Sequence, residues 1–232
     1  RQRQMCIRDR SKKELYNIPD SSFLRCICHA VDVKNLIFTD EDFSVLSNAD
    51  KVVYLFNGCA DCVNSQVRTY IQLGEKNNIH KRHLTSKRSP WYALENRKPA
   101  PIWVSVFNRK GLRFVRNITQ AYNLTTFHCV YNISEFNTDI LFAYLVTDMA
   151  KEIFLDNSRQ YGNGLIKFEP NDLNKGKVAD LRCLSELERH FVLAVYEKLQ
   201  YYGGVCCNYI SLLDKFLSLI HISEPTRPRL IS

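Results

Sequence analysis

The order of hydrophobic and polar residues predicts strands in the middle of the chain. Residues 102–107 and 112–116 follow a period of two, and residues 108–111 (Asn-Arg-Lys-Gly) between them are typical of a turn. Shorter β-rich apolar stretches occur at 51–56, where Asn-Gly follows directly, and at 125–133. We therefore expect a β-hairpin at 102–116 and at least two further strands.

The hydrophobic period lengthens towards the C-terminus. Apolar residues recur at helical spacing between 138 and 153, after Asn137 as a candidate N-cap. Ser185–Glu188 matches a capping box and opens a second amphipathic helix. An earlier helix is expected at 61–73, closed by Gly74. Strands come first and helices later, which favours an α+β fold over a repeating βαβ pattern.

Composition narrows the class of protein. The 232-residue chain has 45% hydrophobic and 24% charged residues, as expected of a folded globular protein. Its sequence contains no apolar run of about 18 residues, the length of a membrane-spanning helix. The N-terminus does not resemble a signal peptide. Nine irregularly spaced cysteines indicate reduced thiols rather than a disulfide framework, and hence a cytoplasmic protein.

Positive charge is concentrated in one part of the sequence. Residues 68–116 contain 12 lysines and arginines against two glutamates, whereas the net charge of the whole chain is +8. Both tryptophans lie among these cations. Arginine pairs with phosphate oxygens and guanine edges, and aromatic rings stack on bases, so the pattern suits a polyanionic partner. In the alternative interpretation Trp103, Val106 and Leu112 are core residues and the cations form a solvated face.

Motifs for catalysis are scarce. The Gly-x-Gly within Tyr161–Leu165 follows a predicted helix, which favours helix termination over nucleotide binding. Cys59 and Cys62 form a Cys-x-x-Cys after a predicted strand, as in thioredoxin-like proteins. With the Cys26–His29 stretch they also give a weak zinc signal. Ordinary reduced cysteines are the simpler interpretation.

Both ends of the sequence contain strings of an unusual kind. Residues 1–10 and 217–232 resemble translated sequencing-adapter read-through, so we expect them to stand outside the fold. This leaves one main domain at 11–200 and a short extension at 201–216.

Five stretches, in order along the chain, carry a family resemblance. They are Thr39–Phe43 with Tyr54–Phe56, Tyr70–Glu75, Arg88–Tyr92 continued by Lys98–Trp103 and Arg113–Asn117, Asn123–His128, and Tyr161–Leu173. The sequence resembles the C-terminal target-recognition region of adenine-specific (N6) DNA methyltransferases of bacterial restriction–modification systems. The similarity covers about Phe23 to about Leu199.

The resemblance implies that catalysis belongs to another domain. In this family a doubly wound domain binds S-adenosylmethionine through Phe-x-Gly-x-Gly and holds the flipped adenine with Asn-Pro-Pro-Tyr/Phe. Neither motif occurs in this sequence. Because adenine N6 is inaccessible in the stack, the base must leave it while the recognition part holds the duplex. We therefore expect a chain that binds double-stranded DNA, is inactive alone and holds no metal or cofactor. Its partners would be the missing N-terminal catalytic domain and a cognate restriction endonuclease.

The resemblance and the charge pattern together select eight candidate DNA-binding residues. They are Lys87, Arg88, Trp91, Tyr92, Arg109, Lys110, Arg113 and Arg116. Three alternatives stay open: part of a combined restriction–modification polypeptide, a stand-alone nucleic-acid-binding module, and a thiol oxidoreductase that uses Cys59 and Cys62.

Overall fold

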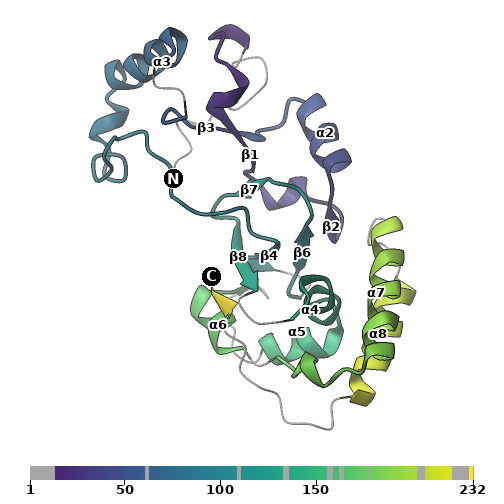
Figure 1. Ribbon diagram of the computed structural model, residues 1–232. Helices are drawn as coiled ribbons and strands as arrows, with labels where there is room; N and C mark the ends of the chain where they lie inside the picture. Colours follow the sequence, from purple (N-terminus) through teal and green to yellow (C-terminus); the bar gives the residue numbers. More distant parts are fainter. Residues whose placement is uncertain are drawn as a thin grey trace. The chain divides into compact units, whose positions relative to one another are not determined.

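A computed structural model describes most of the chain (Figure 1). The described residues are 14–60, 63–108, 111–132, 136–155, 159–161, 165–176, 178–202, 207–220 and 230–231. They form two compact units. Unit 1 comprises Arg1–Asp32, Asp40–Pro99 and Gln120–Leu124, and unit 2 comprises Val33–Thr39, Ala100–Thr119 and Thr125–Ser232. The range 11–200, expected to be one domain, is thus divided between two units.

Unit 1 is built on a small mixed sheet in the order β3-β1-β7. Strand β1 (Phe23–Ile27) pairs antiparallel with β3 (Tyr54–Phe56) and parallel with β7 (Tyr122–Asn123). The strand predicted at 51–56 is confirmed in its last three residues. There Leu55 and Phe56 are both buried. They point to opposite faces of the sheet, and each packs in a separate apolar cluster, Leu55 with Cys26 and Phe56 with Phe23.

Two helices complete the regular structure of unit 1, α2 (Asp40–Asn48) and α3 (Ser65–Lys76). The Asn64 side chain caps α3 by accepting from two first-turn backbone N–H groups. The prediction that Gly74 closes this helix is wrong, because Gly74 is buried within its last turn. A glycine inside a helix costs about 1 kcal/mol, and burial of Val67 and Ile71 on the same helix offsets it.

The larger sheet of unit 2 has the order β11-β8-β4-β6-β2. Its strands are β2 (Ile37–Phe38), β4 (Ile102–Ser105), β6 (Phe114–Asn117), β8 (Phe127–Asn132) and β11 (Leu230–Ile231). Strands β4 and β6 pair antiparallel with Trp103 opposite Val115, which confirms the predicted hairpin. Gly111, in the connection between them, has φ 93°, a conformation that favours glycine.

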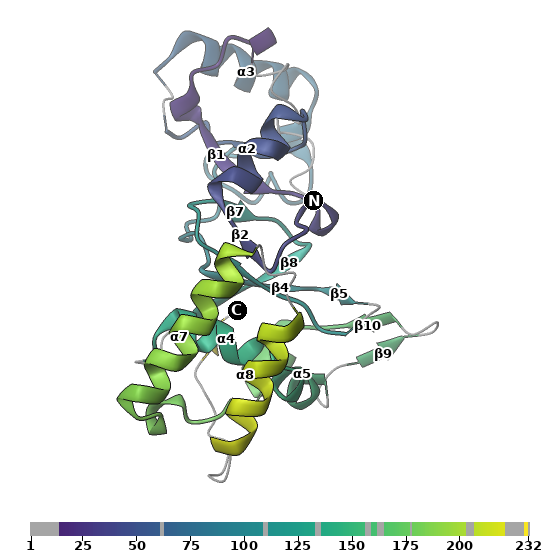
Figure 2. The ribbon, with the colours of Figure 1, turned by 90° about the vertical axis from the view of Figure 1, so that its right-hand side faces the viewer.

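A second sheet in unit 2, in the order β5-β10-β9, bears on two sequence-based expectations. Strand β5 (Phe107–Asn108) leaves the hairpin and pairs with β10 (Leu165–Lys167), so β4 ends at Ser105 rather than at residue 107. Strand β9 (Arg159–Tyr161) pairs antiparallel with β10 (Figure 2). The Gly-x-Gly that was expected to end a helix lies at 162–164, outside the described residues, and the two strands flank it.

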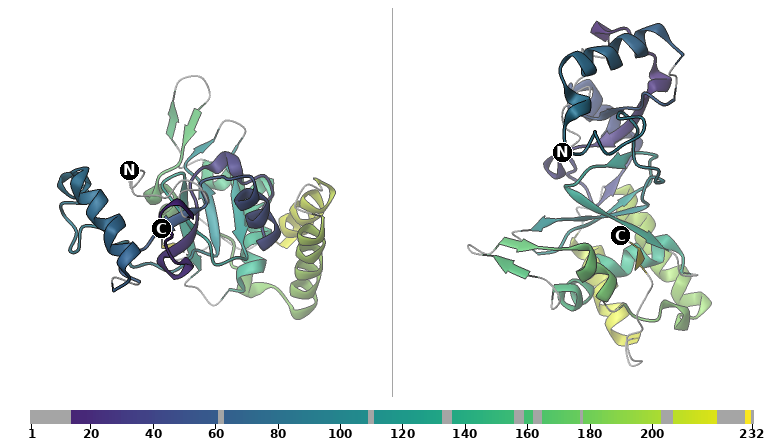
Figure 3. Two further views of the ribbon diagram at one scale, coloured as in Figure 1. Left: turned by 90° about the horizontal axis from the view of Figure 1, so that it is seen from above. Right: turned by 90° about the vertical axis from the view of Figure 1, so that its left-hand side faces the viewer.

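Helices gather on one face of the larger sheet (Figures 1 and 3). They are α4 (Thr138–Leu145), α5 (Asp148–Leu155), α6 (Pro170–Lys175), α7 (Glu186–Tyr201) and α8 (Cys207–Ile220), with α7 and α8 side by side. The N-cap at Asn137 and the capping box at Ser185 are both confirmed. The helix predicted at 138–153 is two helices, because the Thr147 hydroxyl accepts from the backbone N–H of Ala150 and so begins α5.

Both faces of the larger sheet are apolar and buried. Ile102, Val104 and Phe114 belong to the main core with the helices. On the opposite face Trp103 is fully buried, with its ring 5.5 Å from that of Phe38 and 5.6 Å from that of Phe127. The alternative interpretation of Trp103 as a core residue is therefore confirmed.

The observed mixture of helices and sheets confirms the α+β class. None of the helices in the described part of the chain is long and apolar enough to cross a membrane. The tail differs from expectation at two places, because α8 continues to Ile220 and β11 pairs with β8. Without β11, β8 would be an edge strand with unpaired N–H and C=O groups, to which a further strand can add.

The capping box at the start of α7 leads to a testable prediction about the stability of unit 2. In it, Ser185 Oγ and the Glu188 carboxylate each bond to the other residue's backbone N–H. We expect Ser185→Ala to lower the free energy of unfolding by about 1 kcal/mol, measured by urea denaturation followed by circular dichroism. Ser211→Ala, at an exposed position of α8, is the control and is not expected to destabilise. Equal effects of the two substitutions would contradict the capping role.

Candidate nucleic-acid interface

The eight candidate residues fall into three groups. Lys87, Arg88, Trp91 and Tyr92 lie in unit 1, and Arg113 and Arg116 lie in unit 2. Arg109 and Lys110 lie outside the described residues. The basic stretch that is continuous in the sequence is therefore divided between two units at Pro99.

Arg113 forms hydrogen bonds within unit 2. Its Nη2 donates to the backbone carbonyl oxygens of Val33 at 2.7 Å and Asn35 at 3.2 Å. Burial lowers the pKa of this guanidinium from its ordinary value. These bonds fasten the segment that leads into β2 to the sheet, which is a structural role.

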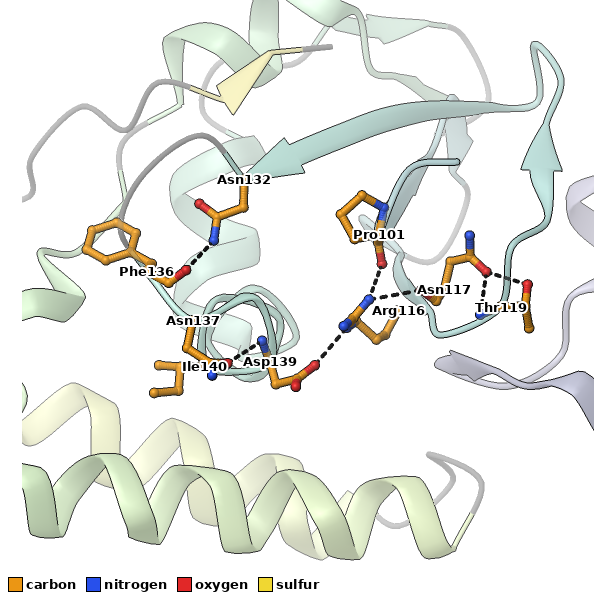
Figure 4. A network of polar contacts seen from close by, with 9 residues as sticks. All are labelled: Pro101, Arg116, Asn117, Thr119, Asn132, Phe136, Asn137, Asp139 and Ile140. Carbon is orange, nitrogen blue, oxygen red and sulfur yellow. Dashed lines mark hydrogen bonds and ion pairs between the residues drawn. The ribbon is translucent and has the colours of Figure 1, made fainter. Parts of the chain in front are cut away.

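Arg116 joins β6 to the first turn of α4 (Figure 4). Its Nε donates to Asp139 Oδ1 at 2.8 Å, and its Nη1 donates to the carbonyl oxygens of Pro101 at 2.8 Å and Asn117 at 2.9 Å. Only 14% of the Arg116 side chain is exposed. Burial and the charge of Asp139 raise the pKa of the Tyr196 phenol above its ordinary value, so that phenol stays neutral beside the pair. The contacts of Arg116 therefore lie mostly inside the protein.

In unit 1 the two aromatic candidates hold a loop to a helix. Trp91 Nε1 donates to Glu75 Oε1 of α3 at 3.2 Å. The rings of Trp91 and Tyr92 pack on the cluster of Phe56, Val67 and Ile71. Both rings are half-buried, so they hold residues 77–95 against α3.

Arg88 shapes the same loop from within. Its Nη1 donates to the carbonyl oxygen of Ala93 at 2.9 Å, and its Nη2 lies 3.6 Å from Glu95 Oε1. The Thr85 hydroxyl donates to the carbonyl oxygens of Ile79 and Arg82. The loop is thus held by its own hydrogen bonds as well as by α3.

The exposed cations of this region form the candidate interface. We call residues 68–98 the basic segment; it carries eight lysines and arginines and two glutamates. Both glutamates make internal contacts, Glu75 with Trp91 and Glu95 with Arg88 and Arg97. The exposed cations are Arg68, Lys76, Lys81, Arg82, Lys87 and Lys98. Lysine and arginine side chains on a pinned loop and a helix are suited to phosphate oxygens.

Of the eight candidates, Lys87 is therefore the one that the structure describes as exposed. Sequence reasoning passed over Lys81 and Arg82, although both lie in the charged stretch. No sequence signal separates them from the other cations, because residue type and spacing do not show which side chains are exposed.

The structure describes three of the four cysteines that the thiol and zinc hypotheses use. Cys26 and Cys28 are buried in a cluster with Leu55. Cys59 is exposed, and Cys62 lies outside the described residues, so the thiol oxidoreductase hypothesis stays untested. Within the described ranges, no three His, Cys, Asp or Glu side chains are grouped as metal ligands.

Sequence comparison supplies the family. The family model described as "Type II methyltransferase M.Eco57I, C-terminal domain" matches residues 6–200. The chain belongs to this family. The resemblance expected from the sequence is thereby confirmed at the level of a methyltransferase C-terminal domain.

Two similar proteins carry the same kind of name. The chain is 53% identical over 195 residues to the Type II methyltransferase M.AccI of Acinetobacter calcoaceticus, covering 82% of this chain and 36% of the relative. It is 24% identical over 119 residues to the Type II methyltransferase M.XamI of Xanthomonas campestris pv. amaranthicola, covering 51% of this chain and 22% of that relative. The chain thus spans about a third or less of the length of these methyltransferases.

The contacts of Arg116 predict a structural phenotype. Arg116→Met would leave the Asp139 carboxylate and two carbonyl oxygens without their donor, so we expect the free energy of unfolding to fall by about 2–3 kcal/mol. Urea denaturation measures the loss, with Lys215→Met at an exposed position of α8 as a control that changes stability by less than about 0.5 kcal/mol. Unchanged stability together with weaker duplex binding would instead make Arg116 a DNA contact.

Proposed function

We propose that this chain is the DNA target-recognition part of a Type II methyltransferase that transfers a methyl group from S-adenosylmethionine to N6 of adenine. Its membership of the methyltransferase C-terminal family supports the enzyme class. One structural observation supports duplex binding: the basic segment exposes cations while its two carboxylates are turned to internal contacts.

The affinity for DNA would come mainly from phosphate contacts of this segment. Lys81, Arg82 and Lys87 lie on a loop held by Trp91 and Arg88. A pinned loop loses little conformational entropy on binding, so more of the contact energy appears as affinity. Cations that neutralise phosphates release condensed counterions, which makes the affinity strongly dependent on salt.

The chemistry would belong to the rest of the methyltransferase. S-adenosylmethionine supplies the methyl group, and no residue of this chain is assigned to it, because the sequence lacks the family's cofactor and adenine-binding motifs. The recognition part would hold the duplex while the adenine leaves the stack. Because its substrate is DNA, we place the enzyme in the cytoplasm.

Salt-dependent binding is the first test. We expect the 232-residue chain to bind duplex DNA, and the triple variant Lys81→Gln/Arg82→Gln/Lys87→Gln to bind more weakly. Loss of three phosphate contacts reduces the slope of log K against log salt by about 2.7. Fluorescence anisotropy with a labelled duplex at several salt concentrations measures both effects.

A control triple removes the same charge elsewhere. Lys34→Gln/Lys198→Gln/Lys215→Gln alters three exposed lysines of unit 2, and we expect its salt slope to stay near that of the unaltered chain. Similar losses for the two triples would mean that net charge, rather than the basic segment, determines binding. No salt-dependent binding by the folded chain would refute the proposal.

The methylated atom is tested with the whole gene product. The protein expressed from the complete reading frame around this chain is incubated with DNA and S-adenosylmethionine, and the digested nucleosides are analysed by mass spectrometry. We expect N6-methyldeoxyadenosine, and none from the 232-residue chain alone. A methylated cytosine would refute the adenine assignment. Cleavage of the DNA with Mg²⁺ would support the combined restriction–modification alternative, and binding without any methylation would support a stand-alone module.

A further inference from the structure

An arginine outside the basic segment is held unusually firmly at the surface of unit 1. Arg25, on β1, places its Nη1 2.6 Å from Asp40 Oδ1, at the start of α2. The same guanidinium lies 3.9 Å from the centre of the Phe43 ring, also on α2. A carboxylate on one side and a ring face on the other fix the plane of the guanidinium.

Arg25 also borders a hollow in unit 1. Among the residues that the structure describes, Asp40 is the only acceptor of this guanidinium. Arg25 lines a hollow of ≈ 480 Å³ together with Phe23, Phe43 and Tyr54. The Tyr54 and Ser47 hydroxyls bond to each other at 3.1 Å on this wall. An acceptor from outside the protein can therefore approach N–H donors that are already oriented.

The hollow lies on the same face of the small sheet as the packing surface of α3. Arg25 pairs with Tyr54, and Phe23 pairs with Phe56. Ring contacts continue across this face from Phe43 to Tyr54, Phe23, Phe56 and finally Tyr70 of α3. Helix α2 and helix α3 thus flank one row of aromatic residues, and the basic segment begins on α3.

The charge around Arg25 favours a neutral partner over a phosphate. Asp40 is 64% exposed and Arg25 35% exposed, so an incoming phosphate meets a carboxylate as well as the guanidinium. The Arg25–Asp40 pair therefore contributes little net attraction to a polyanion. The N–H groups of the guanidinium are nevertheless held in a fixed orientation, so they can still form directional hydrogen bonds. A neutral group with two adjacent acceptors can accept hydrogen bonds from these oriented donors and is not repelled by the Asp40 carboxylate. The edge of guanine, with O6 and N7, is such a group.

We propose that Arg25 is a specificity-determining residue that donates to O6 and N7 of a guanine in the bound duplex, and that Asp40 and Phe43 position it. This inference rests on the proposed function, because it assigns one base contact within the same DNA complex. The basic segment supplies affinity for any sequence, and Arg25 supplies discrimination at one base pair.

Selection from a duplex library with a randomised central segment tests the assignment. The 232-residue chain should enrich sequences with a fixed G·C pair. In Arg25→Lys the charge is kept but the fork is lost, and we expect the preference at that pair to fall by roughly five- to 150-fold, as for loss of a bidentate contact. The salt slope should not change, because no phosphate contact is removed.

A matched arginine–aspartate pair provides the control. Arg182 of unit 2 bonds to Asp180 through its Nε and Nη2, both at 2.7 Å. Arg182→Lys should leave the selected sequence and its preferences unchanged. Thermal unfolding of both variants checks that the fold is retained.

Asp40→Asn separates positioning from simple charge. Removal of the carboxylate should raise affinity for all duplexes slightly and yet weaken the preference at the same G·C pair. A merely structural role for Asp40 would not change the preference at a single base pair. The variant therefore distinguishes a positioning residue from one that only stabilises α2.

Three results would overturn the assignment. One is an Arg25→Gln variant, which removes the charge, that loses affinity equally for all sequences with a salt slope smaller by about 0.9, the signature of a phosphate contact. Another is an unchanged preference at every position, and the third is a selected site without any G·C pair. Absence of all duplex binding by the unaltered chain would refute the proposed function itself, and so differs from these outcomes.

Discussion

A guanidinium group withdrawn from water must keep its hydrogen bonds, and this requirement shapes unit 2. Arg116 lies where the sheet meets α4, and it satisfies a carboxylate and two carbonyl oxygens that would otherwise be poorly paired. Arg113 does the same for the segment that precedes β2. The hairpin, its parallel neighbour β2 and the first helix are therefore joined by arginines as well as by apolar packing.

The availability of internal hydrogen-bond acceptors also separates the cations of unit 1 into internally bonded and exposed groups. Arg88 bonds to a carbonyl oxygen of its own loop and lies near Glu95, so it is largely engaged within the protein. Lys81 and Lys87 lie on the outside of that loop and remain hydrated. Residues of one charge and one stretch of sequence thus have two roles. Internal acceptors near the backbone decide which role each residue takes.

Affinity and specificity would then come from different parts of unit 1. The basic segment offers positive charge with few competing carboxylates, which suits a uniform phosphate backbone. Arg25 offers the opposite combination, a fixed orientation with its charge largely offset by Asp40. A protein that must bind many sequences weakly and one sequence well benefits from this separation, because affinity and specificity can then change independently of each other.

The sequence by itself determined the elements whose signals are local. The capping box at Ser185, the N-cap at Asn137 and the hairpin of β4 and β6 depend on neighbouring residues, and family membership depends on motifs in order. Only the tertiary structure decided that residues 68–116 divide between two units, that β5 leaves the hairpin for β10, and that Arg116 points at Asp139. Those outcomes depend on acceptors and strand partners distant in sequence, and residue type and periodicity carry no information about them.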